Sequence, residues 1–109
     1  MIFVNLVRFP SLRQGKEAEF QEWFKRSNQV YRHSPGFHSR RLLRTADGSY
    51  AAVVEHQSKA TFMAMHTSPE RGGLWAEVQP LLEGRPEPMF YEVVEEARPE
   101  QNRPEGARP

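Results

Sequence analysis

The chain contains no cysteine among its 109 residues. Disulfide bonds, thiolate metal ligands and cysteine nucleophiles are therefore excluded. A surplus of charge is also missing, because 15 lysines and arginines stand against 14 aspartates and glutamates. Nucleic-acid-binding domains more often carry a basic excess on one face, whereas the arginines here are scattered, so we expect no nucleic-acid partner.

Long apolar runs are absent as well. No stretch of the sequence approaches the ~20 apolar residues that a membrane-spanning helix needs. Residues 1–4 are apolar but short, and neither a basic segment nor a cleavage site accompanies them. With 38% hydrophobic and 27% charged residues, the composition is typical of one small folded domain. We expect a cytoplasmic protein that does not contact a membrane.

One long amphipathic helix is predicted over residues 16–33. Its buried stripe falls at helical spacing, while lysines, arginines and glutamates occupy the remaining positions. Pro35 prevents the helix from continuing, and Gly36 allows a tight turn into the next strand. The stripe consists of Phe20, Trp23, Phe24, Ser27, Val30 and Tyr31.

Strands are predicted over residues 2–9, 37–45, 50–56 and 89–94. The two middle strands form a hairpin, because Asp47-Gly48 lies between two runs rich in β-formers. Ser58 begins a short helix that reaches Met65, and Ser68 begins another that runs to Gly84. The domain is expected to span residues 1–96, followed by a disordered tail at 97–109 that lacks large apolar side chains.

This order of elements is the split βαβ of the α+β, ferredoxin-like fold, with an antiparallel sheet. Helices on one face leave the other sheet face without a cover. The positions expected to face away from the helices are Val4, Leu6, Leu42, Ala52 and Val54. A second copy of the chain is the usual cover for such a face, so we expect an obligate homodimer.

Asn5 is the first candidate functional residue. Strand alternation places it on the same face as Phe3 and Val7, beneath the helices. A buried amide that finds no hydrogen-bond partner costs about 1–3 kcal/mol. Asn5 therefore either bonds a neighbouring backbone group or a water, or points into a ligand pocket, where it could hold a substrate oxygen or dioxygen.

The aromatic residues and histidines supply the other candidates. Most aromatics belong to a core, yet a pocket in so small a domain must be lined by the same residues. Trp75 is expected at the start of the third helix, near such a pocket. His66, at the end of the second helix, is either a surface residue or an acid–base or haem-contacting group. His38 and His56 are expected to face solvent. No histidine pair has metal-ligand spacing, so we expect no protein-bound metal.

Several segments together resemble the antibiotic biosynthesis monooxygenase (ABM) family. The resemblance covers residues 2–95 and rests on the order and spacing of its motifs. It implies a dimeric α+β barrel. Members of this family include cofactor-independent monooxygenases that act on polycyclic aromatic or quinol-type compounds, and a branch that degrades haem. The matching segments are residues 4–10, residues 28–43 with the Ser34-Pro35-Gly36-Phe37 junction, residues 60–70, and Tyr91-Glu92-Val93-Val94.

The haem-degrading branch is similar in placing an asparagine on the first strand, which Asn5 matches. The tryptophan position of that branch falls on Met65, and its histidine position falls on or close to Leu74. A leucine cannot ligate iron, and a methionine lacks the shape and N–H of tryptophan. His66 is one residue from Met65, roughly 100° around a helix. Haem is thus possible but disfavoured, and we expect no cofactor.

The resemblance therefore implies a small cofactor-independent monooxygenase, with an aromatic or quinol-like substrate and dioxygen as its partners. Asn5 would bond the substrate oxygen, and His66 would act as the base. Haem degradation and non-catalytic small-molecule binding by a dimer are the alternatives. The residues expected to bind the substrate are Phe20, Trp23, Phe24, Met65, Leu74 and Trp75.

Overall fold

A computed structural model describes residues 1–100 of the chain. It contains one antiparallel sheet with the strand order β2-β3-β1-β4, which confirms the predicted α+β ferredoxin-like fold. The elements in chain order are β1 (Phe3–Arg8), α1 (Glu17–Tyr31), β2 (Phe37–Arg44), β3 (Tyr50–His56), α2 (Lys59–His66), α3 (Pro69–Val78), the 3-10 turn η1 (Gln79–Leu81) and β4 (Glu87–Glu92).

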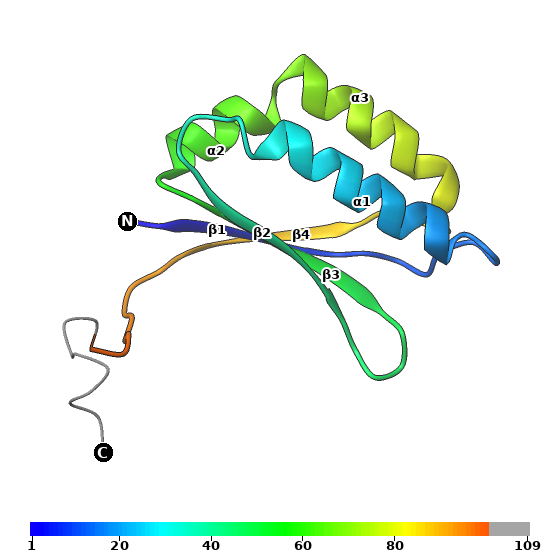
Figure 1. Ribbon diagram of the computed structural model, residues 1–109, viewed down its shortest axis with the longest axis horizontal. Coiled ribbons are helices and arrows are strands. Elements are labelled where there is room, and N and C mark those ends of the chain that lie inside the picture. Colours follow the sequence, from blue (N-terminus) through cyan, green and yellow to red (C-terminus); the bar gives the residue numbers. More distant parts are fainter. Residues whose placement is uncertain (101–109) are drawn as a thin grey trace, which may run out of the picture.

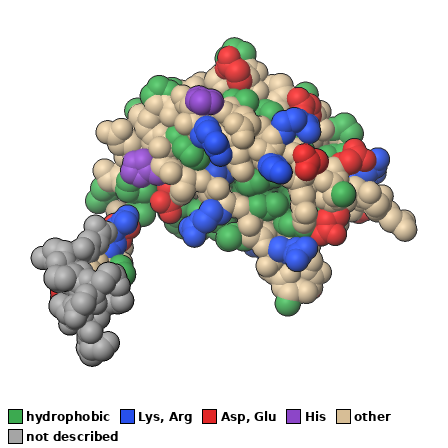
Figure 2. All heavy atoms as spheres, in the orientation of Figure 1, with side chains coloured by type: hydrophobic (Ala, Val, Ile, Leu, Met, Phe, Trp, Pro, Cys, Tyr) green, Lys and Arg blue, Asp and Glu red, His purple; other side chains and the backbone are tan. Residues whose placement is uncertain are grey.

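The three helices cover one face of the sheet and leave the opposite face bare (Figure 1). Basic and acidic side chains are interspersed over the surface seen in Figure 2. Within residues 1–100, no helix has the length and apolarity that crossing a membrane requires. Of the predicted tail at 97–109, residues 101–109 lie outside the described part of the chain.

Side-chain caps start the two short helices at the predicted residues. The Ser58 hydroxyl accepts a hydrogen bond from the Thr61 N–H (3.1 Å), and the Thr61 hydroxyl accepts one from the Ser58 N–H (3.2 Å). This reciprocal pair is a capping box. The Ser68 hydroxyl caps α3 by accepting a hydrogen bond of 3.3 Å from the Arg71 N–H, and Pro69 is the first helical residue.

The end of α3 differs from the prediction, which placed it at Gly84. The α-helix ends at Val78 and continues as the 3-10 turn η1. Pro80 explains the difference, because proline has no N–H to bond the carbonyl one turn earlier. Trp75 accordingly lies in the second half of α3, and not at its start.

The register of the sheet corrects the predicted faces of three residues. Leu42, Ala52 and Val54 point toward the helices, and Ala52 and Val54 are only 2% and 3% exposed. On β3 the buried Tyr50 sets the alternation, so residues 52 and 54 share its face. On β2 an irregularity between Phe37 and Ser39 shifts the phase of the strand.

His56 follows the same alternation and is fully buried, so the prediction that it faces solvent is wrong. Its Nδ1 lies 3.1 Å from the Thr61 hydroxyl. His38 is exposed, as predicted. Val4 and Leu6 alternate with the buried Phe3 and Asn5 and therefore lie on the bare face, as predicted.

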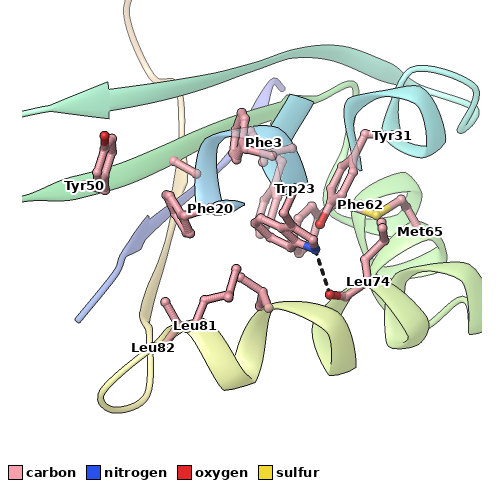
Figure 3. Close-up of a cluster of buried hydrophobic side chains, with 14 residues drawn as sticks. Phe3, Phe20, Trp23, Tyr31, Tyr50, Phe62, Met65, Leu74, Leu81 and Leu82 are labelled. Atoms are coloured by element: carbon pink, nitrogen blue, oxygen red, sulfur yellow. Dashed lines mark hydrogen bonds between the residues drawn. The ribbon is translucent and has the colours of Figure 1, made fainter. Parts of the chain in front are cut away.

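The aromatic stripe of α1 forms the centre of the core. Phe20, Trp23 and Phe24 are all 6% exposed or less. The Trp23 indole N–H donates a hydrogen bond of 2.9 Å to the backbone carbonyl of Leu74 on α3, drawn as the dashed line in Figure 3. This bond ties two helices that are 51 residues apart in the sequence.

Gly36 is required where the chain turns from α1 into β2. Its φ of +82° lies in the left-handed region, which side chains disfavour. A Cβ at this position would also lie 2.6 Å from the Thr61 Cβ, which is closer than real contacts allow. The turn is thus packed directly against Thr61, the residue that forms the capping box of α2 together with Ser58.

We expect Gly36→Ala to lower the free energy of unfolding by roughly 2–4 kcal/mol, from left-handed strain plus the clash with Thr61. Gly48→Ala is the matched control, because Gly48 has a φ of +93° and open space around it. It should cost only about 1–2 kcal/mol. Chemical denaturation of both variants measures the difference, and equal losses would contradict the close packing at Gly36.

Candidate functional site

A cavity of about 750 Å³ lies between the inner face of the sheet and the helices. Residues from all three helices, all four strands and the segment before β4 contribute to its wall. Such a volume is typical of small-molecule sites. The apolar and aromatic side chains of the wall include Val7, Phe9, Trp23, Val54, Phe62, Leu74, Trp75 and Phe90.

One row of residues across the sheet contributes a member from every strand to this wall. Asn5 on β1 is paired with Val54 on β3 and with Phe90 on β4, and Val54 is paired with Arg40 on β2. All four residues line the cavity. Neighbouring strands lie ~4.8 Å apart, so the backbones of Asn5 and Arg40 are separated by roughly 10 Å, with Val54 between them.

Asn5 is 6% exposed and has one partner in the sheet. Its Nδ2 donates a hydrogen bond of 3.2 Å to the backbone carbonyl of Met89 on β4. A carbonyl can only accept, so the amide nitrogen must face Met89 and the Oδ1 is left for another partner. Since Asn5 lines the cavity and this oxygen bonds no described residue, the site offers a hydrogen-bond acceptor at this point.

Arg40 places a guanidinium beneath α1. Its Nη1 donates to the Ser27 hydroxyl (2.5 Å) and to the Asn28 side-chain oxygen (2.8 Å). The guanidinium carbon lies 3.8 Å from the ring centre of Phe24 and 3.9 Å from that of Tyr31. Burial lowers the pKa of Arg40 to about 10; the neighbouring Tyr31 acts in the opposite direction, and the charge of Arg71 lowers the pKa further. The group therefore remains a cation at neutral pH.

His66 and Arg71 add two more nitrogen-bearing side chains to the wall, from α2 and α3. The His66 ring stacks on Phe62 at a centroid distance of 5.3 Å. Burial lowers the pKa of His66 below its usual 6.5, and the neighbouring charge of Arg71 lowers it further. At neutral pH the imidazole is therefore uncharged and able to accept a proton.

The structure brings together five of the eight predicted site residues and separates the other three. Asn5, Trp23, His66, Leu74 and Trp75 all line the cavity. The three residues that lie in the core and outside the cavity wall are Phe20, Phe24 and Met65. All three are buried side chains of the hydrophobic core: Phe20 and Phe24 belong to α1, and Met65 belongs to α2.

Arg40, Tyr31 and Arg71 line the cavity, and the sequence did not predict any of them as site residues. The sequence pattern could have indicated Arg40, because this charged residue lies between the apolar Phe37 and Leu42 on a strand with a buried face. The strand irregularity before Ser39 hid which face that was. Tyr31 was expected only as part of the helix stripe, and nothing in the sequence distinguished Arg71 from the exposed arginines.

The cavity wall does not fit the haem arrangement weighed above. Leu74 has no atom that can ligate iron, and its backbone carbonyl already accepts the Trp23 indole. Met65 lies outside the wall. Across residues 1–100, no cluster of three or more histidine, aspartate or glutamate residues could hold a metal ion.

No protein-family model and no curated protein sequence matches the chain. Solved structures do resemble it. The cofactor-independent oxygenase SnoaB from Streptomyces nogalater is 23% identical, with a TM-score of 0.72 over 91% of this chain and 96% of SnoaB. Rv0793 from Mycobacterium tuberculosis is 19% identical, with a TM-score of 0.79 over 90% of this chain and 100% of Rv0793.

A candidate antibiotic biosynthesis monooxygenase from Caulobacter crescentus is 20% identical, with a TM-score of 0.76 over 86% of this chain and 91% of that protein. At these identities the likeness concerns the fold. The chain therefore has the fold of the antibiotic biosynthesis monooxygenases, as the resemblance of its sequence implies.

Proposed function

We propose that the protein is a small monooxygenase that oxidises an aromatic or quinol-like molecule with dioxygen and without a cofactor. The observation that carries this proposal is the cavity of about 750 Å³, which combines aromatic walls with a hydrogen-bond acceptor at Asn5 and an uncharged imidazole at His66. The shared fold with SnoaB, a cofactor-independent oxygenase, supports it.

The proposed chemistry uses the substrate as its own reductant. A hydroquinone that loses a proton is electron-rich enough to pass electrons to dioxygen. One oxygen atom then enters the ring and the other leaves as water, so that hydroquinone plus dioxygen gives a hydroxyquinone plus water. The substrate supplies all four electrons, and the protein must bind the ring, exclude water and accept a proton.

Two polar side chains are proposed to act on the substrate, Asn5 by positioning it and His66 by accepting its proton. Asn5 Oδ1 can accept a hydrogen bond from a substrate hydroxyl and thereby fix the position of the ring. His66 is the proposed base, since its lowered pKa keeps it neutral at pH 7. Trp23, Leu74 and Trp75 are proposed to hold the ring, while Phe20, Phe24 and Met65 support them from the core.

Oxygen uptake with metal-free protein tests the activity. We expect consumption of dioxygen with hydroquinones such as 1,4-dihydroxynaphthalene, and a hydroxyquinone product by mass spectrometry. Asn5→Ala should lower turnover by about a hundredfold or more, because the ring loses its anchor. The melting temperature should change little, since only the bond to Met89 is lost.

Gln29→Ala is the matched control, because this exposed amide on α1 lies outside the cavity. It should keep full turnover. Failure of the protein to accelerate oxygen uptake with any hydroquinone of the panel would reject the oxygenase and favour a non-catalytic binding protein. A large fall in melting temperature for Asn5→Ala would assign that residue a structural role.

The pH profile tests His66. A base must be neutral to act, so kcat should be constant at and above pH 7 and should fall as the pH drops through the pKa of His66, below 6.5. His66→Gln should lower kcat and remove this acidic limb. An unchanged limb in the variant would show that another group accepts the proton.

We also propose that the chain functions as a homodimer that pairs through the bare sheet face. This face carries apolar side chains, and Leu43 and Tyr91 are 44% and 50% exposed. The pairing register places Leu6, Val53 and Met89 in one outer row between them, with Arg41 of β2 at the end of that row. Uncovered apolar faces of this kind are rare in monomers.

Solution scattering at micromolar concentration should therefore give the mass of a dimer. Val53→Lys should shift the protein toward monomer, because it places a charge at the centre of the proposed interface. Met63→Lys is the control, since Met63 is 39% exposed on α2, on the helical side. A monomeric wild-type protein would refute the dimer.

A further inference from the structure

Arg40 is a cation that its own protein does not neutralise. No ion pair among residues 1–100 includes it, although Arg26, Arg41, Arg44 and Arg98 all have carboxylate partners. Its hydrogen-bond partners are neutral oxygens of Ser27, Asn28 and the Phe24 backbone. A buried charge without a counter-ion is costly, and most proteins avoid it.

The contacts of Arg40 fix the guanidinium plane without using all of its donors. Phe24 and Tyr31 lie against the guanidinium, at ring-centre distances of 3.8 and 3.9 Å. Nη1 donates to Ser27, Asn28 and the Phe24 carbonyl, Nε is buried without a partner, and the Tyr31 side chain is a further polar neighbour that favours the charged guanidinium. The guanidinium of Arg40 is thus held in a fixed orientation beside the cavity, and not all of its N–H donors have a partner.

The rest of the wall has the same sign of charge. Arg71 lies close enough to lower the pKa values of both Arg40 and His66. Arg13 and Arg85 also line the cavity from exposed positions, and Glu83 is the one carboxylate among the described lining residues. Positive side chains therefore outnumber negative ones around the cavity, which favours an anion.

The sheet row relates this charge to the proposed ring site. In the row of paired residues across the sheet, the apolar Val54 lies between Arg40 and Asn5. A planar ring laid on Val54 would meet the Asn5 acceptor at one edge and the Arg40 donors at the other. Asn5 Oδ1 suits a neutral hydroxyl, because an oxygen acceptor repels an anion, and Arg40 suits an anionic oxygen.

We propose that the cavity selects aromatic molecules that carry an anionic oxygen, either a carboxylate or an ionised phenol, and that Arg40 is the residue that pairs with this oxygen. The proposal names the substrate class of the proposed oxygenase and rests on that function where the ligand is called a substrate. An anionic group at Arg40 would supply the counter-ion that the neutral partners Ser27 and Asn28 do not provide.

Binding of matched probes tests this selectivity without any turnover. Anthraquinone-2-carboxylate and its uncharged amide have nearly the same shape, and both are already oxidised. Both tryptophans of the chain, Trp23 and Trp75, line the cavity, so quenching of intrinsic fluorescence reports on the site itself. We expect the wild-type protein to bind the carboxylate about tenfold or more tighter than the amide.

Arg40→Gln should bring the two affinities to within about twofold, and Arg40→Lys should keep part of the preference, because it keeps the charge but loses the fork. A structural role of Arg40 would weaken both probes equally and leave their ratio unchanged. Arg32→Gln is the matched control, since it removes the same charge from an exposed position outside the cavity wall. It should retain the carboxylate preference.

Three outcomes would overturn the proposal: equal binding of the two probes by the wild type, an unchanged ratio in Arg40→Gln, or an equal loss of preference in Arg32→Gln. A tighter fit of 2-hydroxyanthraquinone when its phenol is ionised would support it and extend it to phenolates. Oxygen uptake is scored separately. A carboxylate preference without oxygen uptake would leave an anion-binding protein, and oxygen uptake without the preference would leave an oxygenase of neutral substrates.

Discussion

The hydrogen bond from the Trp23 indole to the Leu74 carbonyl is the constraint on which the architecture depends. It fixes α3 to α1, and α3 packs mainly against α1, α2 and η1 rather than on the sheet. The space left beneath α3 is the cavity, and the same Trp23 forms part of its wall. Trp23 thus belongs both to the hydrophobic core and to the cavity wall.

The polar residues of the inner sheet face make sense only with this cavity. A closed core would have to bury Asn5 and Arg40 with complete sets of partners, since unsatisfied polar groups are costly. Asn5 has one backbone partner, and Arg40 has neutral partners on one nitrogen alone. Departures from good core packing that converge on one cavity are typical of functional sites, where stability is given up for binding.

Strand alternation gives the two faces of the sheet separate tasks. The inner positions of β1 and β3 carry Asn5, Val54 and the buried core, whereas the outer positions carry Val4, Leu6 and Val53. The inner face is covered by helices of the same chain, and the outer face is the surface proposed to pair with a second copy. Substitutions on the two faces should thus separate effects on ligands from effects on assembly.

The sequence by itself determined the order of the elements, the caps of α2 and α3, the hairpin, the resemblance to the monooxygenase fold and the face on which Asn5 lies, because each follows from local chemistry or from simple periodicity. It placed Leu42, Ala52 and Val54 on the wrong face and His56 in solvent, because strand phase depends on a β2 irregularity and on pairing partners. Only the tertiary structure decided that Arg40 stands in one row with Asn5, and that Phe20, Phe24 and Met65 lie behind the wall. Those relations depend on register across three strands and on the rotation of packed helices, which no local pattern encodes.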